Sequence, residues 1–427
     1  MNPVFNLLTS TLDDNRKENR TLHLMSEEDA LSKVQKYLHR QGIDRLSPIA
    51  RKVEREGTPN RRNVVLVFME SMSANLMGTF GSDKKLTPYL DSLYQQSLSF
   101  SHFYSSGIHT NHGIYSTLYS FPAIMKRNAM KGSVIPVYSG LPTVLQENGY
   151  CNLFFMTHES QYDNMNAFLR TNGFDEIYAQ ENYPSEKVVN SFGVQDDFMY
   201  QYALPILNER AGTGNPFFSV LLSISNHPPY VIPPYFHPHS DVLEEQIVEY
   251  ADWSIRQFMQ AAEKQPWFDN TIFVFLGDHG KMVGTPECEM PQSYNHIPLM
   301  IYGKDIKPGV YDGFGGQVDV SPTLLGLLNI SYLQNNFGVN LLEEERPCMF
   351  FTADNLIGAR DSVNMFIYSP DSQQEFKYKL EEGKLHAATG TDEEAFRNLK
   401  DYCFSMLQST ESLVKEHKTL DKVSVKK

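Results

Sequence analysis

The sequence predicts an α/β fold in which a mostly parallel central sheet is covered by helices on both faces. Five short runs are almost entirely apolar, and patterns typical of helices separate them. Strands that are apolar at nearly every position indicate a parallel sheet, because both faces of such a sheet contact helices. The runs span residues 64–68, 153–156, 217–224, 271–276 and 299–302.

Helices are predicted where start and stop signals flank an apolar periodicity. Ser26 precedes an acidic turn and an apolar series, which predicts a capped amphipathic helix. Thr87 and Pro88 fit the N-cap and the first position of a second helix. A third helix is predicted over residues 244–264, before Pro266. The apolar series of the first helix is Ala30, Leu31, Val34 and Leu38.

Three parts are expected along the chain. Residues 1–60 form an N-terminal helical segment and a linker, since the sequence Gly-Thr-Pro-Asn at 57–60 breaks the helical pattern. Residues 61–342 form the α/β domain. Residues 343–427 form a small C-terminal α+β subdomain with a lysine-rich tail. Its elements are strand-like pieces at 349–352 and 364–368 and an amphipathic helix from 393 to about 413.

Composition argues against several classes of function. The 427 residues carry a formal net charge of -14, whereas a nucleic-acid-binding protein usually presents a basic face, so no nucleic-acid partner is expected. The cysteines form no CxxC pair, which supports neither a zinc knuckle nor a disulfide scaffold. No apolar run approaches the roughly 20 residues of a membrane-spanning helix. The four cysteines are Cys151, Cys288, Cys348 and Cys403.

Polar residues closely follow two of the predicted strands. Glu70 comes after the first strand, and Asp278 and His279 come after the fourth. Ligands of open α/β sheets bind beyond the carboxyl ends of the strands. Carboxylate and imidazole groups are ligands of Zn²⁺ and Mn²⁺, and two strand ends can converge on one ion. The simpler alternative for Glu70 is an ordinary charge at a strand end.

A third candidate is Thr110, which lies between Gly107 and Gly113 just before a helical stretch. A hydroxyl at a helix N-terminus is close to free N–H groups and to the positive end of the helix dipole. Both favour an alkoxide and an incoming phosphate, and a metal ion would activate the oxygen further. The alternative is that Thr110 only caps the helix.

These pieces occur in order with several others, and together they resemble the catalytic domain of the lipoteichoic acid synthases. These enzymes are phosphoglycerol transferases of the sulfatase-like family, within the alkaline phosphatase superfamily. Each motif is weak alone, but their joint order is specific. The matching stretches are residues 63–71, 86–91, 103–105, 107–113, 162–165, 172–175, 225–230, 250–252, 270–280, 297–299 and 318–323.

The resemblance implies an alkaline phosphatase/sulfatase-like fold and a site with one divalent cation, Mn²⁺ first and Zn²⁺ or Mg²⁺ as alternatives. The implied metal ligands are Glu70, Thr110, Asp278 and His279, with Thr110 also the nucleophile. His227 is implied to bind the substrate phosphate or to assist the leaving group; the alternative is a histidine hydrogen-bonded in a proline-rich loop. Weaker candidates for substrate contacts, with structural roles equally open, are His109, His158, Asp163 and His296.

Departures from relatives limit the activity that is implied. None of the four cysteines lies in the C/S-x-P-x-R motif of true sulfatases, which argues against sulfate-ester hydrolysis. Asp319 and His296 are the only evident candidates for the extra ligands of a two-metal site, so a one-metal site is expected. The region around Asp163 lacks the tryptophan and arginine that lipoteichoic acid synthases use near the phosphoglycerol, which leaves the head group open.

The function implied is metal-dependent transfer of a phosphoglycerol-type group from a phospholipid to an envelope glycan or lipid acceptor, through a phosphothreonine intermediate. Phosphoethanolamine transfer and phosphodiester hydrolysis are alternatives, and an inactive glycan-binding relative is disfavoured by the intact metal set. Residues 2–7 resemble the junction at which family members leave their last transmembrane helix. An extracytoplasmic location at the cell membrane, with an anchor upstream of this chain, is therefore expected.

Overall fold

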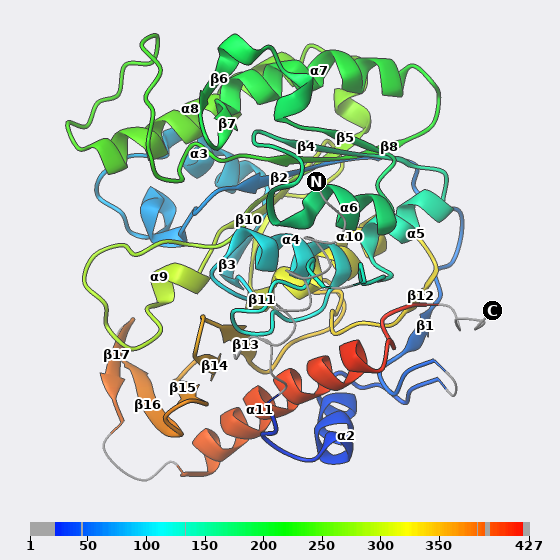
Figure 1. Ribbon diagram of the computed structural model, residues 1–427, viewed down its shortest axis with the longest axis vertical. Coiled ribbons are helices and arrows are strands. Elements are labelled where there is room, and N and C mark those ends of the chain that lie inside the picture. The colour runs from blue at the N-terminus through cyan, green and yellow to red at the C-terminus, as the bar shows by residue number, and fades with distance from the viewer. Residues whose placement is uncertain (1–21, 44–45, 133, 382, 389–392, 422–427) are drawn as a thin grey trace, which may run out of the picture.

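The computed structural model describes residues 22–43, 46–132, 134–381, 383–388 and 393–421 (Figure 1). Residues 2–7, which resemble a membrane junction, and most of the lysine-rich tail lie outside the described residues. None of the helices in the described ranges is long and apolar enough to cross a bilayer.

The centre of the molecule is a mixed sheet of eight strands in which only β10 runs against its neighbours. The sequence therefore predicts the mostly parallel sheet correctly. In spatial order the strands are β11 (Gly309–Gly316), β3 (Leu98–Tyr104), β10 (Leu299–Tyr302), β9 (Thr271–Gly277), β2 (Asn63–Met69), β8 (Phe217–Leu222), β4 (Cys151–Met156) and β5 (Glu176–Tyr178).

Side chains of the central strands alternate between two separate cores. In β2, Val64, Leu66 and Phe68 pack into one core. Val65 and Val67, which point the opposite way, pack into the other. All seven residues of this strand are buried, which explains why its sequence is apolar without alternation.

Helices cover both faces of the sheet (Figure 1). One face carries α3 (Pro88–Gln96), α7 (Asp196–Ala211) and α8 (Leu243–Ala262). The other carries α4 (Thr110–Tyr119), α5 (Leu141–Glu147), α6 (Met165–Thr171) and α10 (Val320–Leu327), and the short α9 (Gln292–Asn295) precedes β10.

A small antiparallel sheet and two helices lie at one end of the molecule, the lower end in Figure 1. There α11 (Glu393–Lys415) packs against both the small sheet and α2 (Glu27–Tyr37). The boundaries between the three expected parts, after residues 60 and 342, stay predictions. The strands of this sheet are β13 (Met349–Thr352), β14 (Ile357–Arg360), β15 (Asn364–Ser369), β16 (Gln374–Glu381) and β17 (Lys384–Ala387). The two-stranded pairs are β1 (Arg51–Val53) with β12 (Tyr332–Gln334), and β6 (Val188–Asn190) with β7 (Gly193–Val194).

The structure confirms one predicted helix start and changes another. Ser26 caps α2, since its hydroxyl accepts a hydrogen bond from the Asp29 amide. Thr87 occupies the N-cap position of α3, but its hydroxyl donates to Asp91 and accepts no helix amide. The carboxylate of Asp252, in α8, accepts the amides of Tyr89 and Leu90. A residue distant in sequence thus provides the cap.

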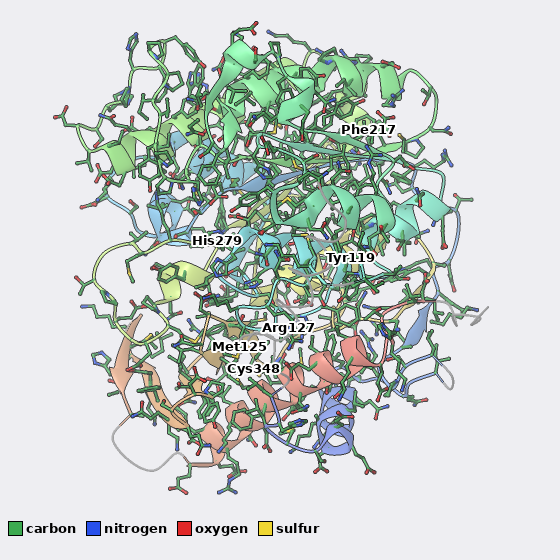
Figure 2. All side chains as sticks on the ribbon, in the orientation of Figure 1. Tyr119, Met125, Arg127, Phe217, His279 and Cys348 are labelled. Carbon is green, nitrogen blue, oxygen red and sulfur yellow. The ribbon has the colours of Figure 1, made fainter. Side chains whose placement is uncertain are left out.

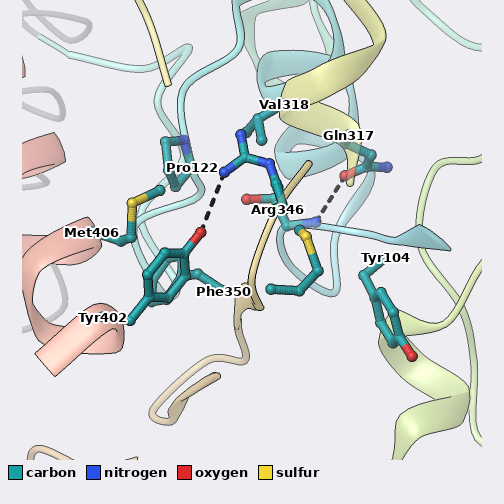
Figure 3. Close-up of a pocket in the computed structure, with 10 residues that line it drawn as sticks. Tyr104, Pro122, Gln317, Val318, Arg346, Phe350, Tyr402 and Met406 are labelled. Atoms are coloured by element: carbon teal, nitrogen blue, oxygen red, sulfur yellow. Dashed lines mark hydrogen bonds between the residues drawn. The ribbon is translucent and has the colours of Figure 1, made fainter. Parts of the chain in front are cut away.

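A buried ion pair ties the start of the C-terminal part to the α/β domain. Nε and Nη2 of Arg346 donate to the two oxygens of Asp319 at 2.7 and 2.6 Å. Arg346 also donates to the carbonyl of Phe337 and to the hydroxyl of Tyr402 in α11 (Figure 3). The Asp319 carboxylate further accepts the amides of Gly316 and Val339, so its oxygens are occupied by protein groups.

Replacing Arg346 with alanine is expected to lower the free energy of unfolding by about 3–5 kcal/mol, because it leaves the Asp319 charge buried without a partner. Urea denaturation followed by circular dichroism measures the change. The control is Lys304→Ala, which breaks the exposed ion pair of Lys304 with Asp269 and should leave the transition nearly unchanged. Equal effects of the two substitutions would contradict the role assigned to Arg346.

Candidate active site

The candidate site lies at the carboxyl ends of two adjacent parallel strands. In the register of β2 with β9, Met69 is opposite Gly277, so Glu70 and Asp278 leave the sheet side by side. Both side chains are buried. The next residue, His279, lies in the middle of the molecule in Figure 2. One ligand atom from each of these three residues lies within 4.8 Å of the other two.

The contacts of Asp278 and His279 leave electron pairs free for a cation. Oδ1 of Asp278 accepts the amides of Ser71 and His279 at 2.8 and 2.7 Å, whereas Oδ2 is buried without a hydrogen-bond partner. Nδ1 of His279 lies 2.8 Å from the carbonyl of Gly280 and must donate to it, so the neutral ring has its lone pair on Nε2. Nε2 lies 3.5 Å from Asp278 Oδ2 and 3.7 Å from Glu70 Oε1.

Burial and the neighbouring Asp278 carboxylate raise the pKa of Glu70 well above its ordinary value. Two buried carboxylates of this kind repel each other unless positive charge lies between them. The unpartnered oxygen, the free imidazole nitrogen and the paired carboxylates therefore fit a divalent cation. A ligand set of oxygen and nitrogen suits Mn²⁺ or Zn²⁺ better than an ion that prefers thiolates.

Thr110 is the first residue of α4, and the N-cap position belongs to His109. The alternative that Thr110 caps this helix is therefore not what the structure has. Oγ1 of Thr110 instead lies 3.3 Å from Glu70 Oε2 and donates to it. The hydroxyl thus points at the acidic cluster, which consists of Glu70 and Asp278 with His279 beside them. It also lies at the positive end of the helix dipole.

Gly113 allows α4 to approach closely the residue that follows β9. A Cβ atom at this position would lie 2.3 Å from the carbonyl oxygen of Asp278, far closer than van der Waals contact allows. Any larger residue would push the helix away from β9. Gly113 therefore sets the spacing between the threonine and the Asp278 backbone.

The predicted residue His227 lies on the neighbouring segment, one residue from Asn226. The amide of Asn226 donates to the backbone carbonyls of Glu70 and Ser71 at 3.0 and 3.2 Å. His227 contacts the ring of Phe192 with centroids 4.2 Å apart. Its Nδ1 lies 2.6 Å from the carbonyl of Pro228, so a neutral ring presents its lone pair on Nε2.

Sequence reasoning missed Lys281, which follows His279 by two residues. Nζ of Lys281 donates to Asn226 Oδ1 at 2.6 Å and lies 5.5 Å from the ring centroid of Tyr230. Burial lowers the pKa of Lys281 to about 8. A desolvated cation beside the acidic cluster suits an anionic substrate. The sequence signal that could have identified Lys281 is its position directly after Gly280.

Two of the weaker candidates lie around the threonine helix. The carboxylate of Asp163 accepts Nδ2 of Asn111 at 3.2 Å and pairs with Lys131 at 2.8 Å. His109 Nε2 lies 2.6 Å from Asp354 Oδ1. Asp354 follows β13, so the C-terminal part reaches the residue before Thr110, and sequence reasoning had not connected the two.

The other candidates lie in packed surroundings, where His158 is buried and His296 is partly buried. Nδ1 of His158 donates to the carbonyl of Glu159, and burial lowers the pKa of the ring. His296 donates from Nε2 to the carbonyl of Ser101, stacks on Tyr104 at 5.2 Å, and has a pKa lowered to about 4 by burial. With Asp319 held by Arg346, neither candidate for a second metal joins the cluster of Glu70, Asp278 and His279.

Comparisons with known proteins show the family of the chain. Residues 62–330, more than half of the chain, match the Sulfatase family. The lipoteichoic acid synthase-like protein YvgJ of Bacillus subtilis is 25% identical over 75% of this chain and 55% of its own length. Lipoteichoic acid synthase of Staphylococcus aureus is 24% identical over 82% of this chain and 58% of its own length. The chain thus spans little more than half the length of these relatives.

Two solved structures share the fold. A protein of the alkaline phosphatase superfamily from Vibrio parahaemolyticus superposes with a TM-score of 0.84 at 25% identity, over 94% of this chain and 99% of that one. The lipoteichoic acid synthase LtaP of Listeria monocytogenes superposes with a TM-score of 0.71 at 22% identity, over 90% and 98%. The chain therefore belongs to the sulfatase family and has the fold of the alkaline phosphatase superfamily.

Proposed function

We propose that this protein transfers a phosphoglycerol-type group from a phospholipid to an envelope glycan or lipid acceptor. The observation that carries the proposal is the hydroxyl of Thr110, which lies at the N-terminus of α4 and donates to Glu70 of the acidic cluster at 3.3 Å. The similarity to lipoteichoic acid synthases supports the choice of donor and acceptor.

The proposed reaction has two displacements at phosphorus. In the first, Thr110 Oγ1 bonds to the phosphorus, the bond to the diacylglycerol oxygen breaks, and the threonine proton ends on that oxygen. In the second, the acceptor hydroxyl oxygen bonds to the phosphorus, the bond from Thr110 Oγ1 to the phosphorus breaks, and the acceptor's proton ends on Oγ1. His227 and Lys281, on the neighbouring strand-end segments, are the residues we propose to hold the phosphate oxygens.

Glu70, Thr110, Asp278 and His279 would hold the divalent cation, with Mn²⁺ the first choice. When bound, the ion supplies positive charge beside the phosphate and the threonine oxygen. Asp278 Oδ2 and His279 Nε2 are the atoms that their other contacts leave free.

The head group is the least constrained part of the proposal, because no tryptophan or arginine marks a phosphoglycerol subsite near Asp163. Phosphoethanolamine transfer is the alternative, and comparing head-group release from phosphatidylglycerol and phosphatidylethanolamine separates the two. The proposed location is the extracytoplasmic face of the cell membrane, where a lipid donor is accessible. Tethering there would raise the effective concentration of enzyme near its substrate.

Thr110→Ala is expected to lower head-group release from phosphatidylglycerol by about 10³-fold or more, as removal of a nucleophile does in other enzymes. Thr110→Ser keeps a hydroxyl and should retain measurable turnover. With the acceptor omitted, mass spectrometry of the wild-type protein should find phosphoglycerol on Thr110. A Thr110→Ala protein that retains most of its activity would refute the nucleophile assignment.

Removal of the metal should destabilise the protein, and Mn²⁺ or Zn²⁺ should restore its melting temperature. An ion at a hundredfold excess over its dissociation constant adds about 2.7 kcal/mol to stability. Asp278→Asn should abolish the response, whereas Asp83→Asn, at an exposed site, should preserve it. Differential scanning calorimetry of chelator-treated protein makes the measurement, and a melting temperature indifferent to both ions would count against the metal site.

A further inference from the structure

A cavity of about 460 Å³ lies between the β6–β7 hairpin, α7 and the proline-rich loop before α8. We call it the tail groove. Its lining is dominated by apolar side chains, and two of them, Val189 and Tyr235, are 43% and 56% exposed. The apolar lining residues are Val189, Phe198, Val231, Ile232, Pro233, Pro234, Tyr235 and Trp253.

The tail groove adjoins the hollow that contains His227. This smaller hollow, lined by His227 and Phe192, shares three lining residues with the groove: Val189, Gln195 and Val231. Aromatic contacts lead on from His227. Phe192 contacts Tyr162 with ring centroids 6.2 Å apart, and Tyr162 contacts His158 at 4.9 Å. The groove therefore begins beside the residue proposed to hold the phosphate.

Several polar groups of the lining already have partners within the protein. Nε2 of Gln195 donates to the carbonyl of Val231, and its Oε1 accepts the hydroxyl of Ser225. The carboxylate of Asp197 accepts the hydroxyls of Tyr235 and Tyr250. A glycan would need free donors and acceptors, whereas an alkyl chain needs only apolar contact. Glu186, Lys187 and Gln201 also line the groove, but the apolar side chains form the majority of the lining and favour a hydrocarbon ligand.

We infer that the tail groove binds an acyl chain of the lipid whose phosphate reacts at Thr110. The assignment rests on the proposed function, because it takes the donor to be a phospholipid. With the phosphate beside His227, the ester-linked chain enters past Val189 and Val231 and lies against Trp253. The chain thereby contributes binding energy away from the reacting phosphorus.

The tryptophans provide a direct readout of binding. The chain contains two, Trp253 and Trp267, and only Trp253 lines the groove, while Trp267 is 4% exposed. Dibutanoyl- and dihexanoyl-phosphatidylglycerol, below their micellar concentrations, are titrated into Thr110→Ala protein. The fluorescence of Trp253 should change saturably, and the dissociation constant should fall about threefold to fourfold for each added CH₂ of the bound chain. Trp253→Phe should abolish the signal.

Two matched variants test whether the acyl chain binds in the tail groove. Val189→Asn places an amide in the groove, and it should weaken dihexanoyl lipid binding on the order of threefold to tenfold. Val310→Asn changes the same residue type at a 57% exposed position of β11, outside the groove, and should leave binding unchanged. Glycerophosphoglycerol, which has no acyl chains, should bind both variants equally.

The outcomes separate this inference from the proposed function. Affinity that is independent of chain length, or equal losses in the two variants, would overturn the tail groove even if the wild-type enzyme cleaves phosphatidylglycerol. Chain-dependent binding without release of any phospholipid head group by the wild-type enzyme would retain the groove and refute the proposed reaction. Displacement of the lipid by a soluble glycan, with no dependence on chain length, would assign the groove to the acceptor.

Discussion

The candidate site depends on the electrostatic repulsion between two buried carboxylates at the ends of adjacent strands. The pairing of Met69 with Gly277 forces Glu70 and Asp278 together where little solvent can screen them. Isolated charges in such a place are costly. The neighbourhood is accordingly rich in donors, including the Ser71 amide and hydroxyl and the Thr110 hydroxyl.

The side chain of Gln317 joins the end of β9 through hydrogen bonds to the segment that precedes Thr110. Nε2 of Gln317 donates to the carbonyls of Gly277 and Asp278, and its Oε1 accepts the amide of Ser106. The carbonyl of Ser106 accepts the amide of Thr352 in β13. The small antiparallel sheet is therefore connected through hydrogen bonds to the backbone of Asp278, and it supports the candidate site as well as the packing.

The sequence predicts best those features that depend on local chemistry. Glu70, Asp278 and His279 were identified because apolar strands end just before them, and Thr110 because glycines and a helix start surround it. Five strands were recognised as apolar runs. Three other strands of the central sheet were missed, since β3 mixes polar and apolar residues, β5 has three residues and β11 is a partly exposed, glycine-rich strand. No local sequence pattern indicates that β10 runs antiparallel to both of its neighbours. Gln317 and Asp354 were missed because their contacts join segments distant in sequence.

The close approach at Gly113 has a consequence for the robustness of the site. The contact between this glycine and the Asp278 carbonyl is steric, and hard-core repulsion depends neither on ionic strength nor on protonation. Ion pairs on the surface weaken as salt concentration or pH changes. The steric contact of Gly113 instead limits how closely α4 can approach the Asp278 carbonyl under any of these conditions. The position of Thr110 relative to Asp278 is therefore expected to stay the same when salt concentration or pH changes.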